Sequence, residues 1–276
     1  MNAYDRFPFM RNVVTPLYLT GLLAIFALCA CETADSANHP AAPAPAPHSI
    51  ALVELFTSEG CSSCPPADAL LAQLAQDKTL DGHVLTIAYH VDYWDNLGWK
   101  DRFDSPAFTD RQSNYSRAFG LDQVYTPQMI VNGQTQFVGS DRAMADKAIA
   151  AALREPPPAD LDLSASFKQP GMIHVRWKAT GVDAGETLQL VLIENDLHTA
   201  IQAGENAGRT LDHQSVARAI AAQPLAKDTT QGEADLTVPP DAKPANLQVV
   251  GFVQNDNTMA VVGAARVAHI EPAATP

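Results

Sequence analysis

The chain has 276 residues, of which 46% are hydrophobic and 18% charged, and its formal net charge is −13 at pH 7. This length allows one large domain or two of ordinary size, and the hydrophobic content is ample for a buried core. A nucleic-acid partner is recognised by a basic face, so the negative charge argues against one. The composition favours a soluble chain with an acidic surface.

Residues 1–30 have the pattern of an export signal. Arg6 and Arg11 precede an apolar run over residues 17–28, which is short for a membrane-spanning helix. Residues 28–31 resemble the bacterial lipobox, in which the last cysteine, here Cys31, becomes lipidated; Cys29 at its second position is a departure. We expect a lipoprotein-type signal peptide and an anchor in a bacterial membrane through Cys31, by default the outer membrane. The alternative is ordinary cleavage that leaves an unlipidated exported protein.

Residues 31–48 are rich in alanine and proline. This composition cannot build a core and favours an extended polyproline II conformation. We expect a linker that holds a folded domain away from the membrane, with a tail of no specific role as the alternative.

Residues 53–66 predict a strand, a turn with two cysteines, and a helix that begins at Pro65. Near a helix N-terminus, free N–H groups and the helix dipole stabilise a thiolate and lower the thiol pKa. Cys61 is then the attacking thiol, and Cys64 the thiol that resolves a mixed disulfide. An inert disulfide, or half of a metal site, would fit the same spacing.

Cysteine counting sharpens this prediction. Of the four cysteines, Cys29 leaves with the signal and Cys31 carries lipid or lies on the tail, so Cys61 and Cys64 remain for the folded part. Export places them in an oxidising compartment, where such a pair forms a disulfide. A disulfide that closes so short a loop stabilises a fold poorly, which lowers the weight of a structural role.

The chain next predicts a buried strand over residues 84–91, an aromatic-rich segment over 92–103, and a helix from Ser105 as N-cap to Gly120. The aromatic segment, with Trp94, is either packing or a platform for substrate beside the thiols. His90, at the strand end, either faces Cys61 or has a structural role.

Thr126 and Pro127 come immediately before a predicted strand, which an Asn-Gly turn connects to a second strand over residues 135–139. Asp141 then caps a helix over residues 143–153.

This order of elements, with a CxxC pair and a Thr-Pro pair, resembles the thioredoxin fold. The resemblance implies a cis peptide bond at Pro127, and it implies that Thr126 and Pro127 hold substrate backbone opposite the cysteines. More closely, the chain is similar to an exported bacterial family of unknown function that has a thioredoxin-like domain and a β-rich C-terminal domain. The matching stretches within residues 49–270 are 53–68, 90–99, 125–129 and 204–211.

Three positions bear on how far the resemblance extends. Gly60 replaces the aromatic residue that thioredoxins carry before the first cysteine, and Ser62-Ser63 matches neither the reductant nor the oxidant dipeptide, so the direction of electron flow stays open. Glu54 resembles the strand acid that relays protons to the second thiol, although it lies one residue further away. Alternatively, Glu54 points to solvent.

The prolines at 156–158 predict a boundary between a thioredoxin-like domain over residues 49–155, with its helical and aromatic insertion, and a domain over residues 159–270. Short alternating runs in the second segment predict a small antiparallel β-sandwich. A polar run that includes Asn206, Arg209, His213 and Arg218 either faces the first domain or forms a solvated loop.

These features predict an α/β protein that acts as an envelope thiol–disulfide oxidoreductase on protein thiols and disulfides, with its own cysteine pair as redox group. A soft-metal protein is one alternative, with Cu(I) held by the two thiolates and His90. A partner-binding module without catalysis is another.

Overall fold

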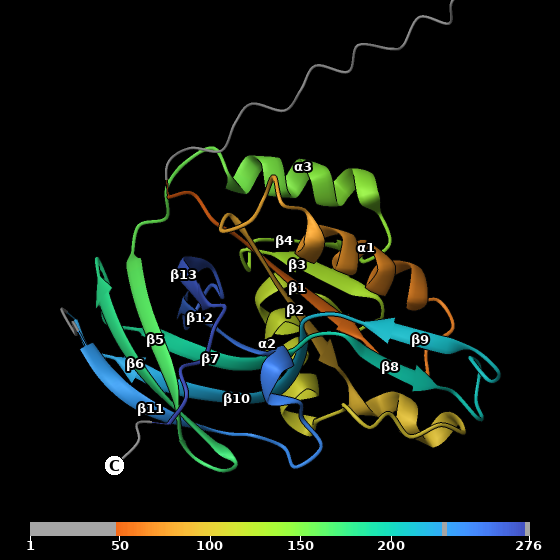
Figure 1. Ribbon diagram of the computed structural model, residues 1–276. Helices are drawn as coiled ribbons and strands as arrows, with labels where there is room; N and C mark the ends of the chain where they lie inside the picture. The colour runs from red at the N-terminus through yellow and green to blue at the C-terminus, as the bar shows by residue number, and fades with distance from the viewer. Residues whose placement is uncertain (1–47, 228–230, 274–276) are drawn as a thin grey trace, which may run out of the picture. The chain divides into compact units, whose positions relative to one another are not determined.

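Strands and helices alternate through residues 51–152 of the computed structural model, which describes residues 48–227 and 231–273 (Figure 1). The elements are, in chain order, β1 (Ala51–Thr57), α1 (Pro65–Gln76), β2 (Val84–His90), the 3-10 helix η1 (Asp92–Leu97), α2 (Pro106–Phe119), β3 (Gln128–Val131), β4 (Thr135–Val138) and α3 (Arg142–Ala152).

The caps expected from the sequence are confirmed. The Ser105 side chain accepts a hydrogen bond from the N–H of Ala107 at the start of α2, and Gly120 ends that helix in the left-handed conformation. Asp141 accepts from the N–H of Met144 and caps α3. These are contacts within one helical turn, so the local sequence is sufficient to predict them.

From residue 160 onward every regular element of the described chain is a strand, apart from the short 3-10 helix η2 (Pro244–Asn246). The strands are β5 (Asp160–Gln169), β6 (Met172–Thr180), β7 (Glu186–Glu194), β8 (Leu197–Ala200), β9 (Thr210–His213), β10 (Val216–Leu225), β11 (Gln231–Thr237), β12 (Leu247–Asn255) and β13 (Val261–Val267).

One eight-stranded sheet has the order β13-β12-β7-β10-β2-β1-β3-β4. β1 pairs parallel with β2 and antiparallel with β3, and β3 pairs antiparallel with β4. β10 joins the two halves of the sheet: Val216 pairs with Ala88 of β2, and the Ala88 N–H donates to the carbonyl of Ser215. Two smaller sheets, β11-β6-β5 and β8-β9, accompany it.

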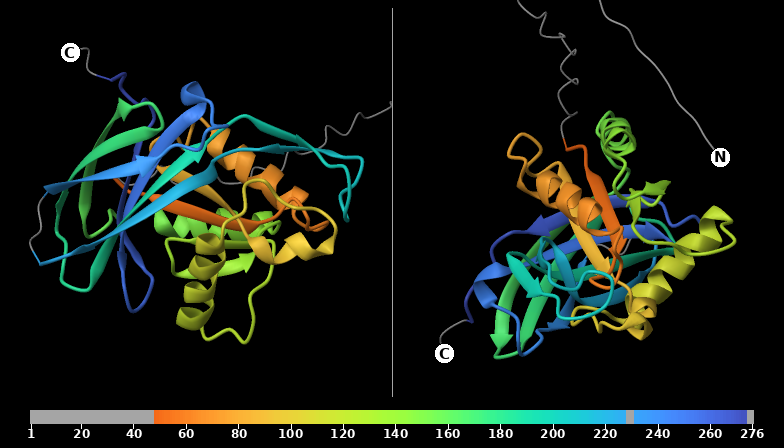
Figure 2. Two further views of the ribbon diagram at one scale, coloured as in Figure 1. Left: turned by 90° about the horizontal axis from the view of Figure 1, so that it is seen from below. Right: turned by 90° about the vertical axis from the view of Figure 1, so that its right-hand side faces the viewer.

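Alternate residues of the large sheet face different partners. Val53 and Leu55 of β1 pack against α1 and α3, whereas Leu52 and Phe56 pack on the face that α2 covers. The α2 face continues across β7, β10 and β12, while the opposite side of β7 and β12 packs against β5, β6 and β11. Figure 2 shows α2 on the side of the sheet away from α1 and α3.

This arrangement corrects one expectation. We expected residues 159–270 to form a β-sandwich of their own, but β7, β10, β12 and β13 extend the sheet of the preceding segment. Only β5, β6 and β11 form a second layer. The two halves meet where β10 pairs with β2 at Val216 and Ala88, and β10 then pairs along its length with β7. The fold is therefore a mixed α/β fold with one large mixed sheet and further antiparallel sheets.

Candidate functional site

The two cysteines lie in the connection between β1 and α1, and they form a disulfide with 5.4 Å between the Cα atoms. Cys64 is the N-cap residue of α1, and its carbonyl accepts from the N–H groups of Ala67 and Asp68. Both cysteines are 0% exposed, although Ser62 and Ser63 between them are exposed. Cys61, which the motif predicts to be the attacking thiol, is thus not exposed to solvent.

The segment before the disulfide is shaped by close packing. The Cys61 N–H donates to the carbonyl of Ser58, and the Ser58 hydroxyl accepts from the N–H of Gly60. A Cβ atom added at Gly60 would lie 3.1 Å from the Cβ of Trp94. The tryptophan therefore occupies the space that the aromatic side chain expected before the first cysteine would need.

Trp94 also connects this segment to the Thr-Pro pair. Its indole N–H donates to the Thr126 hydroxyl over 2.8 Å. The peptide bond between Thr126 and Pro127 is cis, as the resemblance implied. Trp94 therefore links Gly60 to Thr126. Because Gly60 is next to Cys61, the selected residues Cys61, Trp94 and Thr126 lie in one region.

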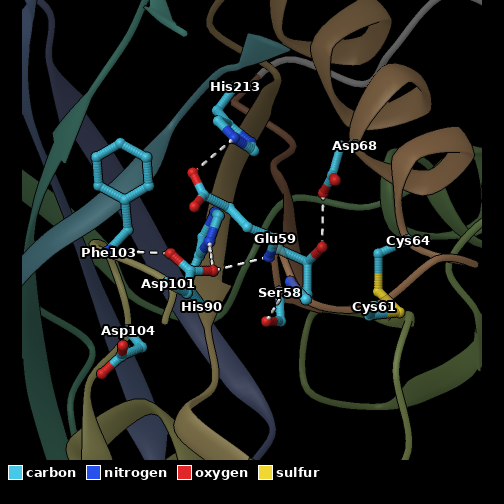
Figure 3. Close-up of polar contacts among 12 residues, drawn as sticks. Ser58, Glu59, Cys61, Cys64, Asp68, His90, Asp101, Phe103, Asp104 and His213 are labelled. Carbon is cyan, nitrogen blue, oxygen red and sulfur yellow. Dashed lines mark hydrogen bonds and ion pairs between the residues drawn. A yellow bond between two sulfur atoms is a disulfide. The ribbon is translucent and has the colours of Figure 1, made fainter. Parts of the chain in front are cut away.

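A buried polar cluster lies beside the disulfide segment and centres on Glu59 (Figure 3). Glu59 Oε2 accepts from the indole N–H of Trp99 over 2.8 Å, and Glu59 Oε1 lies 3.4 Å from Nε2 of His213 on β9. The Glu59 N–H donates to Asp101 Oδ2, which also lies 2.6 Å from Nδ1 of His90. Glu59 Oε1, His90 Nε2 and His213 Nε2 are buried and have no hydrogen-bond partner among residues 48–227 and 231–273.

The charges in this cluster stabilise one another. Burial alone would lower the pKa of His90, but Asp101, Asp68 and Glu59 outweigh it and raise that pKa above its ordinary value. Burial alone would raise the pKa of Asp101, but His90 and the N–H groups of Glu59 and Phe103 outweigh it and lower that pKa. The pair therefore favours an imidazolium beside a carboxylate.

Asp68 stands one helical turn after Cys64 on α1. Its carboxylate accepts from the Thr57 hydroxyl over 2.8 Å. Burial raises the pKa of Asp68, and the positive charges of His213 and His90 oppose this rise. In Figure 3 this side chain lies between the two histidines and the helix that carries Cys64. Asp68 is a carboxylate near the disulfide that sequence reasoning did not select.

Glu54 is placed differently from the expectation. It is fully buried and belongs to the α2 face of β1, away from the helix that carries Cys64. Nε of Arg111 donates to Glu54 Oε2 over 2.6 Å, and the Tyr115 hydroxyl donates to Oε1. Glu54 neither points to solvent nor faces α1, so the structure removes the reason for giving it a proton-relay role.

His90 lies in the buried cluster and does not face Cys61, which was one of its two expected positions. Its ring contacts are Asp101, Phe103 and His213, so it belongs to the buried cluster. Of the polar run expected around residue 206, Asn206 and His213 reach the disulfide segment, whereas Arg218 pairs with Glu194 and Asp241.

No local pattern joins Glu59, Asp101 and His213, because they come from three separate parts of the chain. The available signals were weak: Glu59 lies two residues before Cys61, and His213 belongs to the polar run.

The remaining expectations concern metal, membrane and export. Within residues 48–227 and 231–273, no group of three or more His, Cys, Asp or Glu side chains is arranged to hold a metal ion. The same residues contain no helix that is long and apolar enough to cross a membrane. The expected signal peptide over residues 1–30, the expected lipidation site Cys31 and all of the expected 31–48 linker but its last residue lie outside the described residues.

Comparison with known proteins shows which structures and which family this chain resembles. A crystal structure of a protein from Agrobacterium tumefaciens is 26% identical, covers 81% of this chain and 97% of its own, and has a TM-score of 0.61. A domain of the outer membrane lipoprotein Omp28 from Porphyromonas gingivalis is 14% identical, covers 43% of this chain and 92% of its own, and has a TM-score of 0.29. A search of curated proteins found no match.

The family described as "Protein of unknown function (DUF1223)" matches residues 52–254, which contain the disulfide, the buried cluster, and all but one residue each of β1 and β12. The match covers most of the chain, and the chain therefore belongs to the DUF1223 family of proteins of unknown function.

Proposed function

We propose that the chain is a thiol–disulfide oxidoreductase that works through Cys61 and Cys64. The observation that carries the proposal is the closed disulfide at the start of α1. A bond across three residues constrains the unfolded chain little, and large hydrophobic cores already stabilise the fold. The disulfide therefore has more value as a redox group than as a structural bond.

The surrounding elements support a thioredoxin-like unit. The strand order β4-β3-β1-β2, with β2 parallel and β3 antiparallel to β1, has α1 and α3 on one face and α2 on the other. The order of these elements along the chain is the one on which the resemblance to the thioredoxin fold rests. Thr126 and Pro127, linked to the disulfide segment through Trp94, supply the place for substrate backbone.

The exchange balances without another cofactor. A thiolate of a protein dithiol attacks the Cys61 sulfur, the bond between Cys61 and Cys64 breaks, and Cys64 leaves as a thiolate. The helix N-terminus stabilises that thiolate, which makes Cys64 the better leaving group. The second substrate thiol then displaces Cys61, so the substrate becomes a disulfide and the two cysteines become thiols. The reverse steps describe reduction of a substrate disulfide.

Asp68 is the carboxylate best placed to exchange a proton with Cys64. It follows Cys64 by one turn, and burial raises its pKa towards the range where it can act as an acid. We assign it this role in place of Glu54.

The decisive experiment compares the reduced Cys61→Ser and Cys64→Ser variants in an exchange assay with a peptide disulfide, which the Cys61 thiolate attacks with one peptide thiolate as leaving group. Cys61→Ser should abolish exchange, and Cys64→Ser should accumulate a mixed disulfide that mass spectrometry detects after an acid quench. Equal, unchanged rates in both variants would contradict the proposal.

The reduction potential of the pair, measured against glutathione, then gives the direction: about −120 mV is typical of an oxidant and about −270 mV of a reductant.

The location completes the proposal: the enzyme acts in the bacterial envelope, tethered through lipid on Cys31. Labelling of the full chain with radioactive palmitate should be lost in Cys31→Ser. Labelling that persists in this variant would argue against the anchor. The Cu(I) alternative has its own test, which is copper retained by the reduced chain and lost in Cys61→Ser.

A further inference from the structure

The loop between β8 and β9 lies on the segment that carries the disulfide, although it comes about 145 residues later in the chain. β8 and β9 pair only with each other and form a separate two-stranded sheet. Figure 1 shows this hairpin projecting beside α1. The loop contains the stretch 204–208, in which Gly204 and Gly208 have positive φ.

Asn206 makes the central contact. It is 0% exposed, and its amide NH₂ donates to the carbonyl oxygens of Glu59 and Cys61 over 2.9 and 3.0 Å. Its own Oδ1 accepts from Nη1 of Arg209 over 3.0 Å. One side chain thereby holds the backbone on both sides of Gly60, immediately before the disulfide.

Two further contacts hold the hairpin at its tip and its base. At the tip, Glu205 Oε2 accepts from the N–H of Ser62 over 3.0 Å, and this bond lowers the pKa of Glu205. At the base, the buried His213 of β9 lies 3.4 Å from Glu59. The hairpin is thus attached along the segment 59–62 from one end to the other.

The burial of the sulfur atoms conflicts with exchange in this conformation. Thiol–disulfide exchange requires an attacking thiolate to reach one sulfur of the bond. Both cysteines are 0% exposed, so an element has to move before the substrate can react. β1 and α1 are part of a large core, whereas the hairpin has four-residue strands that pair with no other strand. A two-stranded hairpin is marginally stable by itself, and this one is held mainly by the buried side chains of Leu197, Leu211 and His213, so we infer that it opens at less cost than β1 or α1.

We propose that the β8–β9 loop is a gate that controls access of thiols to Cys61, and that Asn206 and Glu205 are the positioning residues that close it. The inference rests on the proposed function and adds the determinant of which substrates react. In the closed state the hairpin is bonded to residues 59–62, the segment that carries Cys61. When the contacts to Glu59, Cys61 and Ser62 break, a substrate thiolate reaches the Cys61 sulfur and Cys64 leaves as described above.

The test measures reduction of the Cys61–Cys64 disulfide by dithiothreitol, with alkylation and mass spectrometry as readout. Each lost hydrogen bond removes a few-fold bias towards the closed state, so we expect about threefold faster reduction in Glu205→Ala and about tenfold in Asn206→Ala. Asp212→Asn is the matched control: Asp212 lies on the same hairpin, but its carboxylate contacts His198 and not the disulfide segment. This control should react at the wild-type rate.

The outcomes separate the two proposals. If both variants are folded by circular dichroism and are reduced no faster than wild type, the gate is refuted, while the exchange assay with Cys61→Ser and Cys64→Ser still stands. If reduction accelerates as expected but no peptide disulfide exchanges, the gate holds and the oxidoreductase proposal fails. Glu205 is exposed, so Glu205→Ala decides the question should Asn206→Ala fail to fold.

Discussion

Glu54 and Arg111 form a buried ion pair whose loss should be measurable as a loss of stability. Their side chains are 1% and 6% exposed, and the guanidinium also donates to Gln254 over 3.0 Å. In Glu54→Gln the buried cation loses its counter-charge. Removing one partner of such a pair costs about 3–5 kcal/mol, because an uncompensated charge stays in the interior.

Urea unfolding followed by circular dichroism measures this change. A matched control is Asp146→Asn, which breaks the surface pair between Arg142 and Asp146, with side chains 55% and 58% exposed. The control should lose no more than about 0.5 kcal/mol. Under conditions where Glu54→Gln is folded, it should retain the wild-type rate of thiol exchange.

Two results would refute this reasoning. If Glu54→Gln lowers the free energy of unfolding by less than about 1 kcal/mol, then breaking the pair does not leave an uncompensated charge on Arg111. A folded Glu54→Gln that has lost exchange would return Glu54 to the chemistry of the disulfide.

Two further predictions concern the buried cluster and the sheet. The pKa of His90 is raised, so His90 adds stability that is complete below its ordinary pKa and disappears as the pH rises through the pKa of the folded state. The pKa of Asp101 is lowered, so Asp101 adds stability that disappears as the pH falls through the pKa of the folded state. The urea midpoint of Asp101→Asn should therefore fall furthest below wild type between about pH 4 and 6.5, and an equal difference at pH 5 and pH 9 would contradict this. Gly133 and Gly120 both have positive φ, but only at Gly133 would a Cβ atom collide with the backbone of Met259, at 1.8 Å. Alanine at Gly133 should thus prevent folding or lower the thermal midpoint far more than alanine at Gly120, and similar midpoints for the two variants would exclude the collision.

The buried ion pair and the proposed gate have one feature in common. In both, residues after 159 make hydrogen bonds to residues before 155. Gln254 of β12 bonds to Arg111 of α2, and Asn206 holds the backbone beside Cys61. The two segments therefore cannot be separated without exposing polar groups that are now paired. This explains why the family match spans both of them.

The sequence by itself determined the local features. Ser105, Gly120 and Asp141 mark helix ends because their contacts reach only two or three residues along the chain. The pairing of Cys61 with Cys64 followed from the expected export and from the expectation that the folded part has no other cysteine. The order of strands and helices along residues 51–152 followed from the local patterns and from the turn residues between them.

The tertiary structure alone decided how distant segments meet. β10 was not predicted, because its alanine-rich run 217–222 shows little of the alternation of a strand, and it forms through pairing with β7 and β2. The sequence suggested a proton-relay role for Glu54 at the thiols, whereas in the structure Glu54 pairs with Arg111, 57 residues later. Asn206 and His213 meet Cys61 and Glu59 only because the β8–β9 hairpin lies on the segment that follows β1. Contacts of this kind depend on long-range closure of the chain, which a local pattern does not encode.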